Sequence, residues 1–212
     1  RCGATNELAV SEMKETGLRE VPNSSAMLRA ERAEGVSGSC VVCVLEGSRP
    51  ILAEVQALVT KSALASPRRM STGFDHNRMS LLLAVLEKRA GYTFSALDAY
   101  VNVVGGLWLD EPASDLPIAL ALTSALRDRP IPQGMLAIGE VGLAGEVRSV
   151  IRLEDRVREA ERLGFTHCLV PASSLKGMDT SRYSIRITGV KDVVSALRAV
   201  AAAEKSAGAP ER

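Results

Sequence analysis

The sequence predicts an α/β domain with a mixed β-sheet, and two observations lead to this prediction. Two apolar segments, residues 40–45 and 51–60, follow one another across a short polar turn and predict neighbouring strands. Further along the chain, apolar strand-like segments alternate with helix-like segments. An antiparallel start followed by β-α-β-α alternation is typical of an α/β domain with a mixed sheet.

The first 35 residues predict a β-hairpin followed by a short helix. Residues 6–21 contain two strand-like segments around the turn at residues 14–17. Residues 26–31 are helix-like and follow polar residues that can cap a helix. Residues 35–38 begin and end with glycine and mark a junction before the first apolar strand.

The remaining elements follow from periodicity and from capping signals. Residues 66–77 are polar and predict a loop, and residues 78–89 predict a helix with an apolar stripe. Ser114 is expected to cap a helix that ends near residue 128. The other expected elements are strands over residues 99–104, 135–138, 166–170 and 185–187, helices over residues 152–163 and 190–202, and a disordered tail over residues 203–212.

Composition excludes several classes of protein. The chain has 212 residues, of which 46% are hydrophobic and 24% charged, and this balance is typical of a globular domain. The net charge is only +1, so a nucleic-acid surface would have to be a local patch. Aromatic residues make up 3% of the chain, which argues against a base-stacking platform for single strands.

The cysteines indicate buried free thiols rather than a metal site. Cys40 and Cys43 form a C-x-x-C pattern, but they lie in a predicted strand, where positions three apart face opposite sides. A second pair that would complete a zinc site is missing nearby, so we expect no metal. Free thiols imply a reducing compartment, and the sequence has no signal peptide or membrane-spanning run, so we expect a cytoplasmic protein.

Four segments resemble known families. Residues 139–148, GEVGLAGEVR, are similar to the G-E-x-x-L-x-G-x-V run of Lon proteolytic domains. Residues 110–115, DEPASD, lie where those domains carry the D-G-P-S-A-G turn with the nucleophile. Residues 67–89 contain PRR, GFD, NR and LLAVLEKR, which resemble the RadA family of bacterial DNA repair proteins. Residues 1–3, RCG, match the end of that family's K-N-R-F-G motif, with cysteine in place of phenylalanine.

The chain thus resembles the C-terminal Lon-protease-like domain of the RadA family over essentially residues 1–202. The resemblance implies a Lon proteolytic-domain-like fold in residues 36–202. It also implies that residues 1–35, the hairpin and short helix, are the end of a RecA-like ATPase core. Because the sequence begins without methionine, we expect it to be a fragment of a longer chain.

The resemblance implies a function in recombinational DNA repair. Such proteins resemble hexameric, DNA-dependent ATPases that extend branch migration on double-stranded or branched DNA, with a RecA-type recombinase as a partner. ATP, Mg and Zn are expected only in the missing upstream part, since this sequence has no G-x-x-x-x-G-K-[ST] phosphate loop. Arg1 is a candidate for reaching a neighbouring subunit's nucleotide, and the alternative is an ordinary terminal arginine.

The residues that cleave peptides in Lon proteases are replaced in this chain. The resemblance places Ala113 at the position of the serine nucleophile and Arg156 at that of the lysine base. An arginine stays protonated and cannot accept the serine proton. Ser114, one residue further, is either a helix cap or an alternative nucleophile. Arg156 flanks an apolar stripe, so it either pairs across an interface or belongs to a solvated amphipathic helix.

A group of basic residues is the candidate for contact with DNA. Its members are Arg68, Arg69, Arg78, Lys88 and Arg89. A cation at a helix start is unusual, so Arg78 implies a bound phosphate or a neighbouring subunit's carboxylate, with Asp75 as the competing local partner. Three hypotheses follow: a non-proteolytic ring scaffold that contacts duplex DNA, a peptidase that uses Ser114, or an oligomerisation scaffold without DNA contact.

Overall fold

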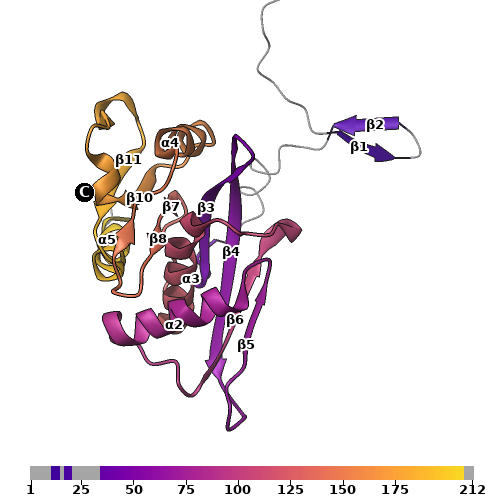
Figure 1. Ribbon diagram of the computed structural model, residues 1–212, viewed down its shortest axis with the longest axis vertical. Coiled ribbons are helices and arrows are strands. Elements are labelled where there is room, and N and C mark those ends of the chain that lie inside the picture. Colours follow the sequence, from indigo (N-terminus) through magenta and orange to yellow (C-terminus); the bar gives the residue numbers. More distant parts are fainter. Residues whose placement is uncertain (1–10, 15–16, 21–33, 208–212) are drawn as a thin grey trace, which may run out of the picture.

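The computed structural model describes residues 11–14, 17–20 and 34–207 (Figure 1). Strands β1 (Ser11–Lys14) and β2 (Gly17–Glu20) pair antiparallel, which confirms a hairpin within residues 6–21. The short helix expected over residues 26–31 and the candidate Arg1 lie outside the described residues. The division of the chain at residue 35 stays a prediction.

A mixed seven-stranded sheet forms the centre of residues 34–207, with the order β11-β10-β7-β3-β4-β6-β5. The pairs β11–β10, β10–β7, β7–β3 and β6–β5 are parallel, and β3–β4 and β4–β6 are antiparallel. This arrangement confirms the predicted α/β class and the mixed sheet. The strands are β3 (Ser39–Glu46), β4 (Arg49–Lys61), β5 (Arg69–Thr72), β6 (Leu97–Val103), β7 (Met135–Ala137), β10 (His167–Pro171) and β11 (Arg186–Val190).

Helices cover the sheet in two layers, each with its own apolar core. The larger core joins one face of the sheet to α2 (His76–Ala90), α3 (Asp115–Arg127) and α5 (Val193–Ala207). The smaller core joins the other face to α4 (Leu153–Arg162). A separate two-stranded hairpin, β8 (Glu140–Val141) with β9 (Val147–Arg148), follows β7. Figure 1 shows α2 and α4 at different ends of the sheet.

The cysteines lie where the period of the strand predicts. Cys40 belongs to the larger core and Cys43 to the smaller one, so their thiols face opposite sides of β3. Both are buried, as is Cys168 of β10. Burial raises the pKa of the Cys43 thiol to about 12, so this group is a neutral thiol and a poor nucleophile at neutral pH.

Two boundaries differ from the sequence prediction. The expected loop over residues 66–77 contains β5, a four-residue strand that pairs with β6 at one edge of the seven-stranded sheet. Its polar sequence hides it, because an edge strand with an open face has no continuous apolar run. The expected tail begins too early, since α5 continues to Ala207 and residues 203–207 are helical. The long alanine-rich segment explains this extension, because alanine has the highest helix propensity.

His167 makes the stability of the fold depend on pH. It is 9% exposed in β10, and its Nε2 lies 2.8 Å from Thr188 Oγ1 of β11. Burial, with a smaller contribution from Arg186, lowers the pKa of His167 below 6.5. A histidine with a lowered folded-state pKa contributes stability above the unfolded pKa and loses it as the pH falls below about 6.5. We therefore expect the free energy of unfolding to decrease between pH 7 and pH 5.

Urea unfolding of the wild type and of His167→Gln at several pH values checks this expectation. The decrease attributable to His167 is limited to about 1.4 kcal/mol per pH unit, the value for one proton. The His167→Gln variant should show a shallower decrease than the wild type. Parallel curves for the two proteins would show that His167 does not titrate differently on folding.

Candidate functional site

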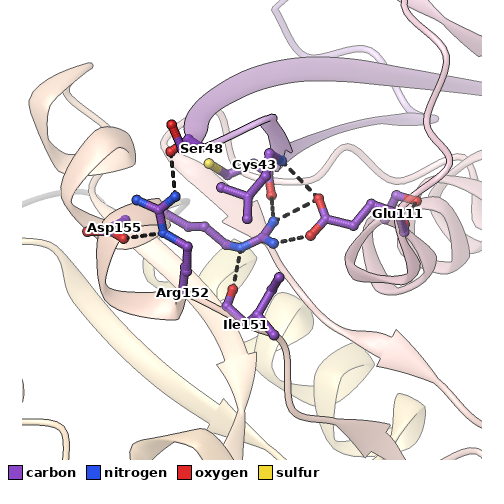
Figure 2. Close-up of polar contacts among 9 residues, drawn as sticks. Cys43, Ser48, Glu111, Ile151, Arg152 and Asp155 are labelled. Carbon is purple, nitrogen blue, oxygen red and sulfur yellow. Dashed lines mark hydrogen bonds and ion pairs between the residues drawn. The ribbon is translucent and has the colours of Figure 1, made fainter.

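Arg156 is one of two fully buried charged residues of the candidate site, the other being Asp115. It lies on α4 with a fully buried side chain. Its guanidinium group donates to two backbone carbonyls, to Ile151 at 3.0 Å and to Cys43 at 2.7 Å. It also forms two hydrogen bonds with the carboxylate of Glu111, one of them 3.1 Å from Nη1 to Oε2 (Figure 2). The arginine head is thus held by three segments of the same chain.

Glu111 completes this arrangement. It directly precedes η2 (Pro112–Ser114), and its Oε2 accepts a hydrogen bond from the backbone N–H of Leu45 at 2.9 Å. The Glu111 carboxylate therefore connects the end of β3, the turn before α3 and helix α4 (Figure 2). Such a two-point arginine–carboxylate contact is strongly directional and fixes the relative position of the groups.

Both alternatives predicted for Arg156, pairing across an interface and a place on a solvated helix, were wrong. It neither lies on a solvated helix face nor needs a partner chain, because its partner is Glu111, 45 residues earlier in the same chain. The periodicity places Arg156 beside Leu153 and Val157 on the buried side of α4, where only a paired charge is tolerated. The available signal was the acidic Glu111 in the DEPASD segment.

A second arginine fastens the start of α4. Arg152 precedes the helix in a left-handed conformation, with φ 54°. Its Nε lies 2.8 Å from Asp155 Oδ2, and its Nη1 donates to the Ser48 carbonyl at 2.6 Å (Figure 2). The turn between β3 and β4 is thereby tied to α4 as well.

The candidate nucleophile positions lie in the turn that leads into α3. Ala113 and Ser114 are both buried, with exposed fractions of 1% and 0%. The Ser114 hydroxyl donates to the Glu111 carbonyl at 2.6 Å and makes no capping bond to α3, so the expected side-chain cap is wrong. Ser114 itself has helical backbone angles, whereas a capping residue is extended. Arg156 carries a permanent charge beside this turn, which leaves it without the properties of a base.

Arg78 finds its anion inside the same chain. Its Nε donates to Asp115 Oδ1 at 2.5 Å and its Nη2 to Asp115 Oδ2. Asp115 is fully buried and also accepts the backbone N–H of Val141 at 3.0 Å. Burial raises the pKa of Asp115, and the bonds from Arg78 and Val141 oppose that increase. Asp75 acts instead as the N-cap of α2, accepting the Arg78 N–H at 2.8 Å.

The other predicted DNA-contact residues do not form one compact cluster. Arg69 donates to the carbonyls of Leu97 and Phe94, the latter at 2.7 Å, and so holds the segment before β6. Arg68 is exposed directly before β5, whereas Lys88 and Arg89 are exposed at the far end of α2. Eleven residues of helix separate Arg78 from Arg89, which is about 16 Å along the axis.

The described part of the chain shows neither a metal cluster nor a membrane helix. Among the described residues, no group of three or more His, Cys, Asp or Glu side chains is placed to hold a metal ion. No helix within the same residues is both long and apolar enough to cross a bilayer.

Comparison with known proteins defines the class first. Residues 69–174, half of the chain, match the family described as "ChlI: Subunit ChlI of Mg-chelatase", and the chain belongs to this family. More particularly, the chain is 50% identical over 198 residues to the DNA repair protein RadA of Bacillus subtilis (strain 168). It is 46% identical over 200 residues to the DNA repair protein RadA of Streptococcus pneumoniae (strain ATCC BAA-255 / R6).

These matches confirm the resemblance to RadA. They cover 93% and 94% of this chain, but 43% and 47% of the two relatives. The chain therefore spans less than half the length of the curated relatives that it matches. The matches alone therefore do not assign the activity, substrates or partners of a full-length relative to this chain.

Proposed function

We propose that this chain is the non-proteolytic, Lon-like part of a RadA-type DNA repair ATPase, where it serves as an oligomerisation scaffold and contacts duplex DNA. The observation that carries the proposal is 50% identity, over 93% of the chain, to a protein named DNA repair protein RadA. In this proposal ATP, Mg and Zn belong to a preceding motor region, and the assembled protein is a ring. The buried thiols of Cys43 and Cys168 fit a reducing, cytoplasmic setting.

The buried ion pair supports the absence of peptidase chemistry. A Ser–Lys dyad requires a serine hydroxyl and a lysine that can become neutral. By the resemblance to Lon domains, Ala113 and Arg156 take those two positions, and the guanidinium group of Arg156 is held by Glu111. Ser114, the alternative nucleophile, is fully buried and donates its proton to a backbone carbonyl.

A peptidase assay tests this part of the proposal. We expect hydrolysis of a fluorogenic peptide by the chain to equal the buffer blank, with no change in the Ser114→Ala variant. Hydrolysis above the blank that disappears in Ser114→Ala would support the alternative of a serine peptidase and refute the non-proteolytic assignment.

Three exposed cations are the best candidates for contact with DNA. Arg68 directly precedes β5, and Lys88 and Arg89 lie in the last turn of α2; all three are exposed. Arg89 makes one long contact within the chain, from its Nε to the Leu143 carbonyl at 3.4 Å. Arg69 and Arg78 complete the proposed set, but their guanidinium groups hold acceptors of this chain, so replacing them would also disturb the fold. With few aromatic residues in the chain, the proposed contact is to the phosphate backbone, independent of base sequence.

Fluorescence anisotropy of labelled duplex DNA can locate this contact. The triple variant Arg68→Ala/Lys88→Ala/Arg89→Ala is expected to bind DNA at least about tenfold more weakly than the wild type at low salt. Each lost phosphate contact reduces the number of counterions that binding releases, and this release favours binding. A matched control, Arg158→Ala/Lys176→Ala/Arg182→Ala, removes the same charge from exposed residues of and near α4. Equal weakening by both variants would show that the contact is not on the α2 side.

A further inference from the structure

A hollow of about 430 Å³ lies between helix α2 and the β8–β9 hairpin. Its apolar wall is formed by Leu82 and Val85, which are buried on the inner side of α2. Two leucines stand at its rim with much of their surface in water: Leu81 is 48% exposed and Leu143, at the tip of the hairpin, is 67% exposed. A concave apolar surface with exposed leucines at its edge is typical of a binding site.

The charged groups of this hollow are unequally paired. Arg78 is committed to the buried Asp115 through two hydrogen bonds. Glu140 has a half-exposed carboxylate, and its nearest cation in the described part of the chain is that same Arg78, at 4.0 Å. Glu146 and Arg148 lie 3.8 Å apart and offset one another. Arg78 is therefore shared between Asp115 and Glu140, and the lining of the hollow carries three carboxylates against two guanidinium groups. The excess charge beside the apolar wall is negative, and Glu140 is the carboxylate with the weaker hold on Arg78.

We propose that this hollow docks a peptide segment of a partner protein that presents an aliphatic side chain next to a lysine or arginine. The aliphatic group would pack on Leu82 and Val85 and cover the two rim leucines. The neighbouring cation would pair with Glu140, which gives the site its preference for one sign of charge. The proposal concerns a protein-docking surface and does not depend on the DNA contact proposed above.

The floor of the hollow is built to hold its shape. Asp115 bonds to Arg78 of α2 and to the Val141 N–H of β8, so one buried carboxylate ties both walls together. The tip of the hairpin is closed by bonds between Gly142 N–H and the Glu146 carbonyl at 3.0 Å, and between Ala144 N–H and Glu146 Oε2 at 3.1 Å. A site with fixed walls loses little conformational entropy when a segment binds.

Chemical-shift mapping with short peptides tests the proposal on the whole 212-residue chain. The probe is acetyl-Leu-Leu-Arg amide, and the controls are acetyl-Leu-Leu-Glu amide and acetyl-Ser-Ser-Arg amide. We expect the probe to shift the amide signals of Leu81, Val85 and Leu143, and to bind at least about fivefold more tightly than either control.

Three variants separate the contributions. Glu140→Gln should weaken binding of the probe about fivefold but should not weaken binding of acetyl-Leu-Leu-Glu amide. Leu143→Ser should weaken binding of both leucine peptides. Both changes are at half-exposed or exposed side chains, so the fold should persist in a thermal melt. Glu46→Gln, an exposed change at the end of β3, should leave binding unaltered.

Specific outcomes would overturn the proposal. Equal binding of the three peptides, or shifts that map away from the hollow, would remove the evidence for a docking site of this chemistry. If the signals of Leu81 and Leu143 changed on dilution of the chain alone, the occupant would be a second copy and not a partner protein.

Discussion

Replacing Arg156 by methionine is expected to lower the free energy of unfolding by about 3–5 kcal/mol. The substitution would leave the carboxylate of Glu111 without its cation and the carbonyls of Cys43 and Ile151 without that donor. Removing the buried partner of an ion pair is costly because the remaining charge is poorly hydrated, and the side chain of Glu111 is only 22% exposed. Urea denaturation of the variant measures the effect.

A double-mutant cycle separates the loss of the pair from the loss of packing. Arg156→Met/Glu111→Gln should recover much of the stability, because neither partner then leaves an unpaired charge. Arg158→Met is the matched control, since Arg158 lies on the same helix and makes only an exposed contact with Glu154 at 3.4 Å. We expect less than about 1 kcal/mol for the control. Strictly additive losses in the cycle would contradict a direct coupling of Arg156 with Glu111.

Replacing Asp115 by alanine is expected to cost about 2–4 kcal/mol of unfolding free energy. The change would leave the Arg78 guanidinium without its two bonds and the Val141 N–H buried without its acceptor. Because Asp115 connects α2, α3 and β8, we also expect the amide signal of Val141 to move and its hydrogen exchange to accelerate.

Asp110→Ala is the matched control for this variant, since Asp110 is exposed in the turn that precedes α3. Its effect should stay within about 0.5 kcal/mol, the usual range for a surface substitution. An Asp115→Ala variant as stable as the wild type, with an unchanged Val141 signal, would show that this carboxylate does not hold the three elements together.

Local patterns predicted the regular part of the fold. The apolar runs of β3 and β4 and the stripe of α2 are long enough to be visible in sequence, and their bounds moved by only a few residues. Strand β5 was not predicted because its four residues, of which only Met70 is apolar, are too few to show a hydrophobic period. The placement of Cys40 and Cys43 on opposite faces followed directly from the alternation of a strand.

Local sequence patterns could not predict the ion pairs of the candidate site. Arg156 and Glu111 are 45 residues apart, and Arg78 and Asp115 are 37 residues apart. Helical spacing identifies contacts between residues three or four apart and says nothing about such distant partners. For Arg78 the sequence offered a bound phosphate, a neighbouring subunit's carboxylate or Asp75, and for Arg156 an interface or a solvated helix face. Neither set of alternatives included the actual partners, Asp115 and Glu111.

The central claim is that this chain contacts duplex DNA through its phosphate backbone, and a salt titration tests it most directly. Labelled duplex DNA is titrated with the wild-type chain at several salt concentrations, and binding is followed by fluorescence anisotropy. The account predicts binding at low salt with a logarithmic slope of about −0.9 for each phosphate contact, hence about −3 for three cations. A folded chain that fails to bind at low salt, or binds without dependence on salt, would contradict the account.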